Sequence, residues 1–229
     1  MAREISELLN KVHCADCLEL MREMPDKSVD LVLTDPPYGI KRDKGFGGAI
    51  GFGGHGAPIQ RRTYDDEWDT ERPSKEAFDL ILEKSKHAII FGGNFFSDLL
   101  PAGKHWIVWD KQNTMPTFGD CELMWTNIDR NSVKKVKIQY NGLIGKEPER
   151  FHPTQKSLKV IEWVLQNYSE PGDTILDPFL GSGTTAVACK KLGRNFIGIE
   201  KEPAYITIAE KRLEKVNNRK ITDFFGVED

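Results

Sequence analysis

Strands and helices alternate closely between residues 152 and 217, and this alternation constrains the fold more than any other feature. Residues 174–176 and 195–199 are short apolar runs that are typical of buried strands. Helical periodicity follows each of them, over residues 184–192 and again over residues 205–213. A strand–helix–strand–helix order predicts an α/β fold with a doubly wound, mostly parallel, Rossmann-like sheet.

The same reasoning predicts five further elements. Apolar periodicity or β-branched composition predicts helices over residues 74–85 and 156–168 and strands over residues 28–33, 87–91 and 105–109. A length of 229 residues fits a single domain, residues 1–229, with small insertions at about 39–73 and about 111–151. Residues 45–56 (GFGGAIGFGGHG) are rich in glycine and are either a lid or substrate contact beside a ligand site, or a slack surface loop.

Composition excludes several classes of function. The net charge of −3 gives no general attraction to a polyanion, and no apolar run is long enough for a membrane span. The first residues lack the pattern of a signal peptide, so we expect a cytoplasmic protein. Cys14 and Cys17 have C-x₂-C spacing, but no second pair follows, so we expect reduced thiols and no metal site.

The stretch LVLTDPPYGI places an acid, two prolines and a tyrosine directly after the strand predicted over residues 28–33. Ligands of open α/β sheets bind at such strand ends. Pro36 and Pro37 fix the backbone and hold Asp35 in an extended conformation. A functional role for Asp35 to Tyr38 is therefore favoured over an ordinary strand exit.

The stretch ILDPFLGSGTT is the second informative motif. A strand ends at Asp177, and Gly181 and Gly183 predict a tight turn into a helix, where a ligand can approach the backbone. Glu200 ends the next strand, where a carboxylate can accept hydrogen bonds from ribose hydroxyls.

A dinucleotide-dependent dehydrogenase is the first alternative for this second motif. The third glycine of G-x-G-x-x-G is missing, because Ala186 follows the turn. Asp177 and Phe179 also suit a methionine-bearing nucleoside better than a pyrophosphate.

With both motifs present, the chain resembles the DNA amino-methyltransferases, which transfer a methyl group from S-adenosyl-L-methionine to an exocyclic amine of adenine or cytosine. The resemblance covers nearly the whole chain and rests on TDPPYG, DPFLGSGTT, FHPTQKS, FIGIEKEPAYITIAEKRL and the lead-in CADCLELMREMPDKSVDLVL. The catalytic motif precedes the cofactor motif, which is the circularly permuted order of the family's β group. Ser157 departs from the family pattern, which usually has proline there.

The resemblance assigns site residues. The catalytic residues it implies are Asp35, Pro36, Pro37 and Tyr38. The cofactor-binding residues it implies are Asp16 for the adenine, Thr154 and Lys156 for the methionine carboxylate, Glu200 for the ribose, and Asp177, Phe179, Gly181 and Gly183 around the methionine. Neither a metal nor a covalent intermediate is required.

An exocyclic amine is a poor nucleophile because its lone pair is delocalised into the ring. The Asp35 carboxylate and the Pro36 carbonyl would accept its hydrogens and favour a tetrahedral nitrogen, since preorganised acceptors stabilise developing charge. Tyr38 would stack on a base that has rotated out of the duplex. Asp35 favours adenine N6. Three alternatives remain. The first is transfer to cytosine N4, for which serine is more usual at position 35. The second is a protein-glutamine or RNA substrate, for which asparagine is more usual there, and the third is a non-catalytic S-adenosylmethionine-binding module.

DNA is the expected substrate, and local basic clusters are the candidates for phosphate contact. They contain Lys41, Arg42, Arg61, Arg62, Lys134, Lys135 and Lys137. No separate recognition domain fits between residues 110 and 152, so target recognition would come from that segment and the glycine-rich loop, or the target site is short. A cognate restriction endonuclease and a homodimer are compatible with the resemblance.

Overall fold

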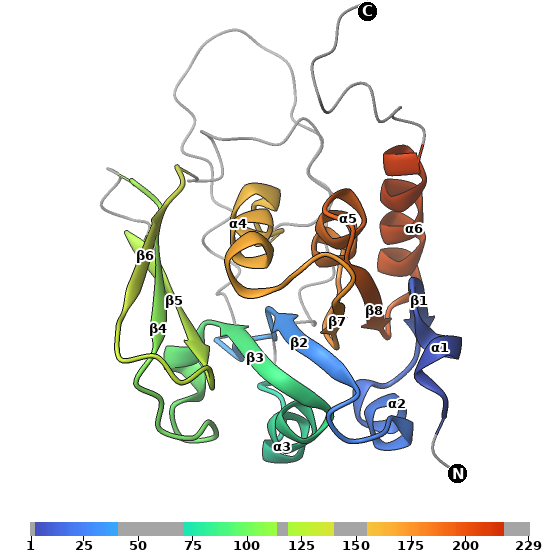
Figure 1. Cartoon of the computed structure of the whole chain (residues 1–229), viewed down its shortest axis with the longest axis horizontal. Coiled ribbons are helices and arrows are strands. Elements are labelled where there is room, and N and C mark those ends of the chain that lie inside the picture. The colour runs from blue at the N-terminus through green and yellow to red at the C-terminus, as the bar shows by residue number, and fades with distance from the viewer. Residues whose placement is uncertain (1–2, 41–70, 114–118, 140–154, 218–229) are drawn as a thin grey trace, which may run out of the picture.

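The computed structural model describes residues 3–40, 71–113, 119–139 and 155–217, and every structural statement below concerns these ranges. Here the chain forms one eight-stranded sheet with helices on both faces (Figure 1). Within the ranges given, no helix is long and apolar enough to cross a lipid bilayer.

The sheet has the strand order β1-β8-β7-β2-β3-β5-β4-β6. All neighbouring strands are parallel except at β5, which runs antiparallel to β3 and β4. The strands are β1 (Lys11–Cys14), β2 (Val29–Thr34), β3 (Ser85–Phe91), β4 (Trp106–Asp110), β5 (Cys121–Thr126), β6 (Lys134–Lys137), β7 (Thr174–Asp177) and β8 (Asn195–Glu200). The predicted doubly wound, mostly parallel sheet is therefore confirmed.

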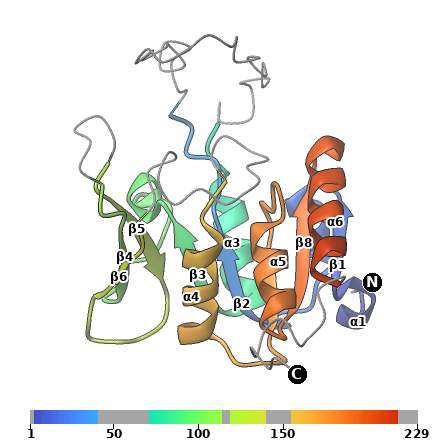
Figure 2. The same ribbon diagram turned by 90° about the horizontal axis from the view of Figure 1, so that it is seen from above.

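The helices form one layer on each side of the sheet. Helices α4, α5 and α6 pack side by side on one face, and α2 and α3 pack together on the other (Figures 1 and 2). The helical elements are α1 (Ile5–Leu8), α2 (Cys17–Glu23), α3 (Lys75–Lys84), the 3₁₀ helix η2 (Gly93–Phe96), α4 (Leu158–Tyr168), α5 (Thr184–Lys191) and α6 (Pro203–Asn217).

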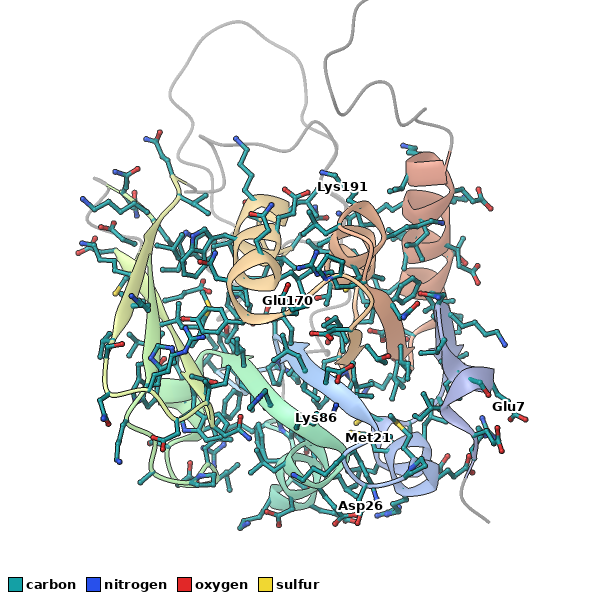
Figure 3. All side chains as sticks on the ribbon, in the orientation of Figure 1. Glu7, Met21, Asp26, Lys86, Glu170 and Lys191 are labelled. Atoms are coloured by element: carbon teal, nitrogen blue, oxygen red, sulfur yellow. The ribbon has the colours of Figure 1, made fainter. Side chains whose placement is uncertain are left out.

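Two apolar cores lie on the two faces of the sheet. Strand β2 supplies both, because alternate residues of a strand point to opposite faces. Leu31 and Leu33 pack in the cluster that contains α4, whereas Val32 packs with residues of α3. Figure 3 shows Met21, which is fully buried, lying inward from α2, while the side chain of Glu7 lies at the periphery.

Most predicted elements are confirmed, with shifts of one or two residues at their ends, and α6 is longer than the periodicity over residues 205–213 indicated. The helix predicted from Lys156 begins instead at Leu158, because Ser157 has an extended backbone and its carbonyl accepts the first helical hydrogen bonds. Lys156 therefore precedes the helix. Strands β5 and β6 lie within residues 111–151, so the described parts of that segment belong to the main sheet.

Candidate active site

Four parallel strands end beside one another at the same edge of the sheet, and each end carries an acidic residue. The order of these strands is β1, β8, β7 and β2. The acidic residues at or just after their carboxyl ends are Asp16, Glu200, Asp177 and Asp35. The two sequence motifs, distant in the chain, are thus brought together by the adjacency of β2 and β7.

A buried hydrogen bond joins the two motifs directly. Thr34 Oγ1, in the last residue of β2, donates to Asp177 Oδ1 at 2.7 Å. The backbone N–H of Phe179 donates to the same oxygen at 3.1 Å. Burial raises the pKa of Asp177 to about 6, although the hydrogen bonds from Thr34 and Thr185 oppose this rise. Asp177 therefore fixes the start of the glycine turn against β2.

The glycine turn between β7 and α5 is held by Glu200. The backbone N–H of Gly181 donates to Glu200 Oε2 at 2.8 Å, and that of Glu202 donates to Oε1 at 2.9 Å. Gly181 has a φ of +54°, and a Cβ placed on it would meet no protein atom within 4 Å. Open space at a left-handed backbone position is what a closely approaching ligand requires.

Gly183 is needed for a different reason. Its φ is +84°, and a Cβ there would lie 2.7 Å from Ala209 Cβ and 3.0 Å from Ala209 Cα. Arg212, also on α6, donates to the carbonyl of Ser182 at 2.6 Å. Gly183 thus permits the close packing of the turn on α6. We expected both glycines to leave space for a ligand, but only Gly181 has open space beside it.

Asp16 lies at the end of the site next to Glu200. It is exposed, caps α2 and accepts hydrogen bonds from the backbone N–H groups of Leu18 at 2.8 Å and Glu19 at 3.3 Å. The backbone N–H of Ala15 donates to the Glu200 carbonyl at 3.2 Å, which fixes the two strand ends together.

Asp35 lies in a compact group of charged side chains. Its Oδ1 accepts a hydrogen bond from the Tyr38 hydroxyl at 2.7 Å, and its Oδ2 lies 3.1 Å from Lys156 Nζ. Lys156 Nζ also lies 3.1 Å from Glu122 Oε2, and Lys111 Nζ lies 2.6 Å from Glu122 Oε1. Cations and carboxylates therefore alternate from Lys111 through Glu122 and Lys156 to Asp35, and we call these four side chains the charge row.

The pKa values in the charge row reflect a balance of burial and pairing. Burial raises the pKa of Asp35 above its usual value, with Lys156 opposing the rise. Burial alone would lower the pKa of Lys156, but Asp35 and Glu122 raise it well above its ordinary value. For Glu122, burial raises the pKa, but Lys156 and Lys111 produce a net decrease. Lys156 is therefore a permanent cation at neutral pH.

The Tyr38 ring is packed from several sides. It stacks on Phe95 with a centroid distance of 4.6 Å and an interplanar angle of 17°, and it meets Phe96 edge-on at 5.9 Å. A Cβ on Gly92, whose φ is +66°, would lie 2.4 Å from Tyr38 Cε1. Burial, followed by the nearby Asp35, raises the pKa of the Tyr38 hydroxyl, so it stays protonated and donates.

The other predicted residues fall into two groups. Thr154, Lys41, Arg42, Arg61 and Arg62 lie outside the described residues. Lys134, Lys135 and Lys137 are exposed on β6, at the edge of the sheet. They do not share one face, because alternation places Lys135 and Lys137 opposite Lys134. Lys135 also forms an ion pair with Asp110 at 3.0 Å.

Several site residues were missed by sequence reasoning. Glu122 and Lys111 carry no motif, and only the antiparallel return of β5 brings Glu122 to the site. Gly92 and Phe95 belong to the stretch GGNFF directly after β3, where a glycine pair after a buried strand was the available signal.

Thiols and metal ligands add nothing to this site. Cys14, Cys17, Cys121 and Cys189 are free thiols, and burial raises the pKa of Cys17 to about 11. Across the ranges that the structure describes, no group of three or more histidine, cysteine, aspartate and glutamate side chains is arranged to hold a metal ion.

A doubly wound α/β sheet with acidic motifs at adjacent strand ends defines a class of proteins that bind a small ligand across the carboxyl edge of the sheet. A more specific assignment comes from family comparison, in which the model of the family N6_N4_Mtase, described as DNA methylase, matches residues 29–211. The protein belongs to this DNA methylase family.

Individual relatives agree with this assignment. The Type II methyltransferase M.HinfI of Haemophilus influenzae is 29% identical over 263 residues, covering 94% of this chain and 71% of its own. The Type II methyltransferase M2.LlaDCHI of Lactococcus lactis subsp. cremoris is 28% identical over 240 residues, covering 88% of each chain.

Solved structures show the same fold. The M1.HpyAVI–SAM complex has 27% sequence identity and a TM-score of 0.58, covering 89% of this chain and 98% of that one. The PvuII DNA methyltransferase, which is cytosine-N4-specific, has 17% identity and a TM-score of 0.59, covering 90% and 89% of the two chains. At this identity, the second likeness concerns the fold alone.

Gly183→Ala should destabilise the fold by about 2 to 4 kcal/mol, because a left-handed alanine costs about 1 kcal/mol and overpacking costs about 1 to 3 kcal/mol. Urea unfolding measures the change. Gly193→Ala is the matched control, since Gly193 has a φ of +70° with no atom within 4 Å of an added Cβ. Equal losses in the two variants would contradict the contact with Ala209, and Ala209→Gly should partly rescue Gly183→Ala.

Proposed function

We propose that this DNA methylase transfers a methyl group from S-adenosyl-L-methionine to the exocyclic N6 of adenine at a short, specific DNA site. S-Adenosyl-L-methionine is the methyl donor. The observation that carries the proposal is the hydrogen bond between Thr34 and Asp177, which holds the Asp35 turn beside the glycine turn. In the chain, the Asp35 motif precedes the glycine turn, in agreement with the permuted order of the β group.

The residues around the glycine turn fit the methyl donor. Gly181 leaves open space beside the backbone, and Glu200 presents a half-buried carboxylate at the adjoining strand end. Asp16 would meet the adenine, Glu200 the ribose, and Asp177 and Phe179 the methionine part. When bound here, the sulfonium group supplies an activated methyl group. Lys156 was expected at the methionine carboxylate, but its observed contacts lie with Asp35, Glu122 and Tyr38.

The Asp35 turn fits the amine that accepts the methyl group. In this structure Asp35 Oδ1 accepts a hydrogen bond from the Tyr38 hydroxyl. When a base enters the site, an N–H of its amine would replace the hydroxyl as the donor. The Pro36 carbonyl would accept the second N–H. The nitrogen would then form its bond to the methyl carbon as the carbon–sulfur bond breaks, and the amine would lose one proton to solvent. Such preorganised acceptors stabilise developing positive charge without rearrangement.

Tyr38 would receive the flipped base on one face only. Phe95 already stacks against the other face at 4.6 Å, so the base would extend an existing aromatic stack. Stacking of a base on an aromatic side chain contributes about 1 to 3 kcal/mol and does not depend on sequence. Target choice must therefore come from other contacts.

The modified base can be identified directly. DNA incubated with the purified protein and S-adenosylmethionine is digested, and its nucleosides are analysed by mass spectrometry. N6-methyladenine is expected. N4-methylcytosine would replace the adenine assignment with the cytosine alternative. Absence of any methylated nucleoside across a diverse DNA pool would favour a non-catalytic S-adenosylmethionine-binding module.

Asp35→Ala should lower the rate of methyl transfer by at least about a hundredfold, because loss of one preorganised electrostatic partner costs roughly 3 kcal/mol in the transition state. Affinity for S-adenosylmethionine should change little, since Asp35 lies on the base side. Single-turnover assays and calorimetry measure the two quantities. Asp35→Asn, which keeps the shape, should also be slow, and rapid transfer by either variant would contradict the assignment.

Gly181→Ala should weaken S-adenosylmethionine binding by about tenfold or more, because a methyl group would enter the space expected for the ligand. Gly193→Ala again serves as control, because it carries the same left-handed strain just before the start of β8, away from the carboxyl ends of the strands. Calorimetric titration compares the two variants. Normal affinity in Gly181→Ala would mean that the ligand does not approach the turn there.

Lys135 and Lys137 share a face of edge strand β6 and remain our candidates for DNA phosphate contact. Exposed lysines also protect sheet edges from pairing with other chains, and that role predicts no effect on DNA affinity. Replacing both with alanine should lower the slope of log K against log salt by about 0.9 per lost contact. Lys11→Ala with Lys211→Ala, near the opposite edge of the sheet, is the control. Anisotropy titrations giving identical slopes would remove these lysines from the DNA interface.

A further inference from the structure

Lys156 occupies the centre of the charge row. Its Nζ lies 3.1 Å from Asp35 Oδ2, 3.1 Å from Glu122 Oε2 and 3.2 Å from the Tyr38 hydroxyl oxygen. Its side chain is only 12% exposed, and the ammonium also lies 5.4 and 5.5 Å from the ring centroids of Tyr38 and Phe91, beside the hydroxyl end of the Tyr38 ring. A cation held on this many sides has a fixed position.

Lys156 is the cation between the carboxylates of Asp35 and Glu122. In the described part of the chain, Lys156 provides the only ion pair of Asp35, whereas Glu122 is paired with both Lys156 and Lys111. Removing the Lys156 charge would leave two carboxylates facing a half-buried site without the cation between them. Like charges in such a site disfavour ionisation of one of the two groups.

We propose that Lys156 is a positioning residue for methyl transfer: it keeps the Asp35 carboxylate ionised and aimed at the target amine, and Glu122 limits how much of the lysine charge reaches Asp35. This inference rests on the proposed function, and it identifies the residues that control the charge and orientation of Asp35 on the base-binding side of the site. It differs from an assignment of Lys156 to the methionine carboxylate, which would make the lysine part of the donor site.

The sign of the pH dependence follows from the groups around Asp35. They are Tyr38 on its own turn, Lys156 before α4, Glu122 on β5, Asp177 at the end of β7, and Lys111 behind Glu122. Lys156 lowers the pKa of Asp35, whereas burial and Glu122 raise it. Loss of the lysine charge should therefore move the acidic limb of activity to higher pH, and loss of the Glu122 charge should move it to lower pH.

The experiment measures single-turnover methyl transfer to DNA against pH for the wild type, Lys156→Gln, Lys156→Arg and Glu122→Gln. At neutral pH, Lys156→Gln should be slower by about tenfold or more, with its acidic limb raised by about one pH unit. Lys156→Arg should keep the limb near that of the wild type. Glu122→Gln should shift it in the opposite direction.

A matched control separates position from general stability. Lys191 and Glu162 form a half-buried ion pair between α5 and α4, and Figure 3 shows Lys191 in that helical layer. Lys191→Gln removes a comparable pair and should leave the acidic limb in place. Thermal unfolding of every variant checks the fold. If Lys156→Gln does not fold, the direction in which Glu122→Gln moves the acidic limb still tests the proposal.

Calorimetry with S-adenosylmethionine distinguishes the two roles of Lys156. Affinity should stay within about threefold in Lys156→Gln, because the lysine serves the base side. A loss of affinity of tenfold or more with an unmoved acidic limb would overturn the proposal and place Lys156 at the donor. Shifts of Lys156→Gln and Glu122→Gln in the same direction would also overturn it.

A readout that needs no turnover separates this inference from the proposed function. If the wild type methylates no DNA, the proposed function fails, but ¹³C NMR titration of carboxyl groups still follows Asp35. Its signal is assigned by Asp35→Asn. Asp35 should titrate at higher pH in Lys156→Gln and at lower pH in Glu122→Gln, and an unchanged titration in both variants would refute the pairing.

Discussion

The hydrogen bond from Thr34 to Asp177 links the ends of two neighbouring parallel strands, and the rest of the site is arranged around it. Because β2 and β7 are parallel, both chains leave the sheet at the same edge. A hydrogen bond to a buried carboxylate contributes about 1.5 to 3 kcal/mol, more than a neutral one. It therefore fixes the Asp35 turn and the glycine turn relative to each other.

The charge row solves a problem that this junction creates. A carboxylate near the buried end of β2 loses part of its hydration, and an uncompensated buried charge is strongly unfavourable. Lys156 compensates Asp35 from outside the strand, Glu122 offsets part of the Lys156 charge, and Lys111 in turn compensates Glu122. The charge row is neutral as a whole. Within it, the Lys156 ammonium favours the ionised form of Asp35, the carboxylate beside which positive charge would develop on an amine.

Three glycines around the site have left-handed backbones for three different reasons. Gly92 admits the Tyr38 ring, Gly183 admits Ala209 of α6, and Gly181 leaves its space open. Only the last is suited to a ligand. The turn between β7 and α5 thus combines a glycine required for packing, Gly183, with one beside open space, Gly181, and the surrounding atoms distinguish them.

The sequence by itself determined the layered α/β fold and the two strand-end motifs, because apolar periodicity and turn residues are local signals. It also placed Asp35, Asp177 and Glu200 at the ends of their strands, but the neighbourhood of those strands in the sheet came from the structure. Only the tertiary structure decided the partner of Lys156, the role of Gly183 and the presence of Glu122. These depend on side-chain contacts between segments distant in the chain, and no local pattern encodes the direction in which a lysine points or the helix that a glycine meets.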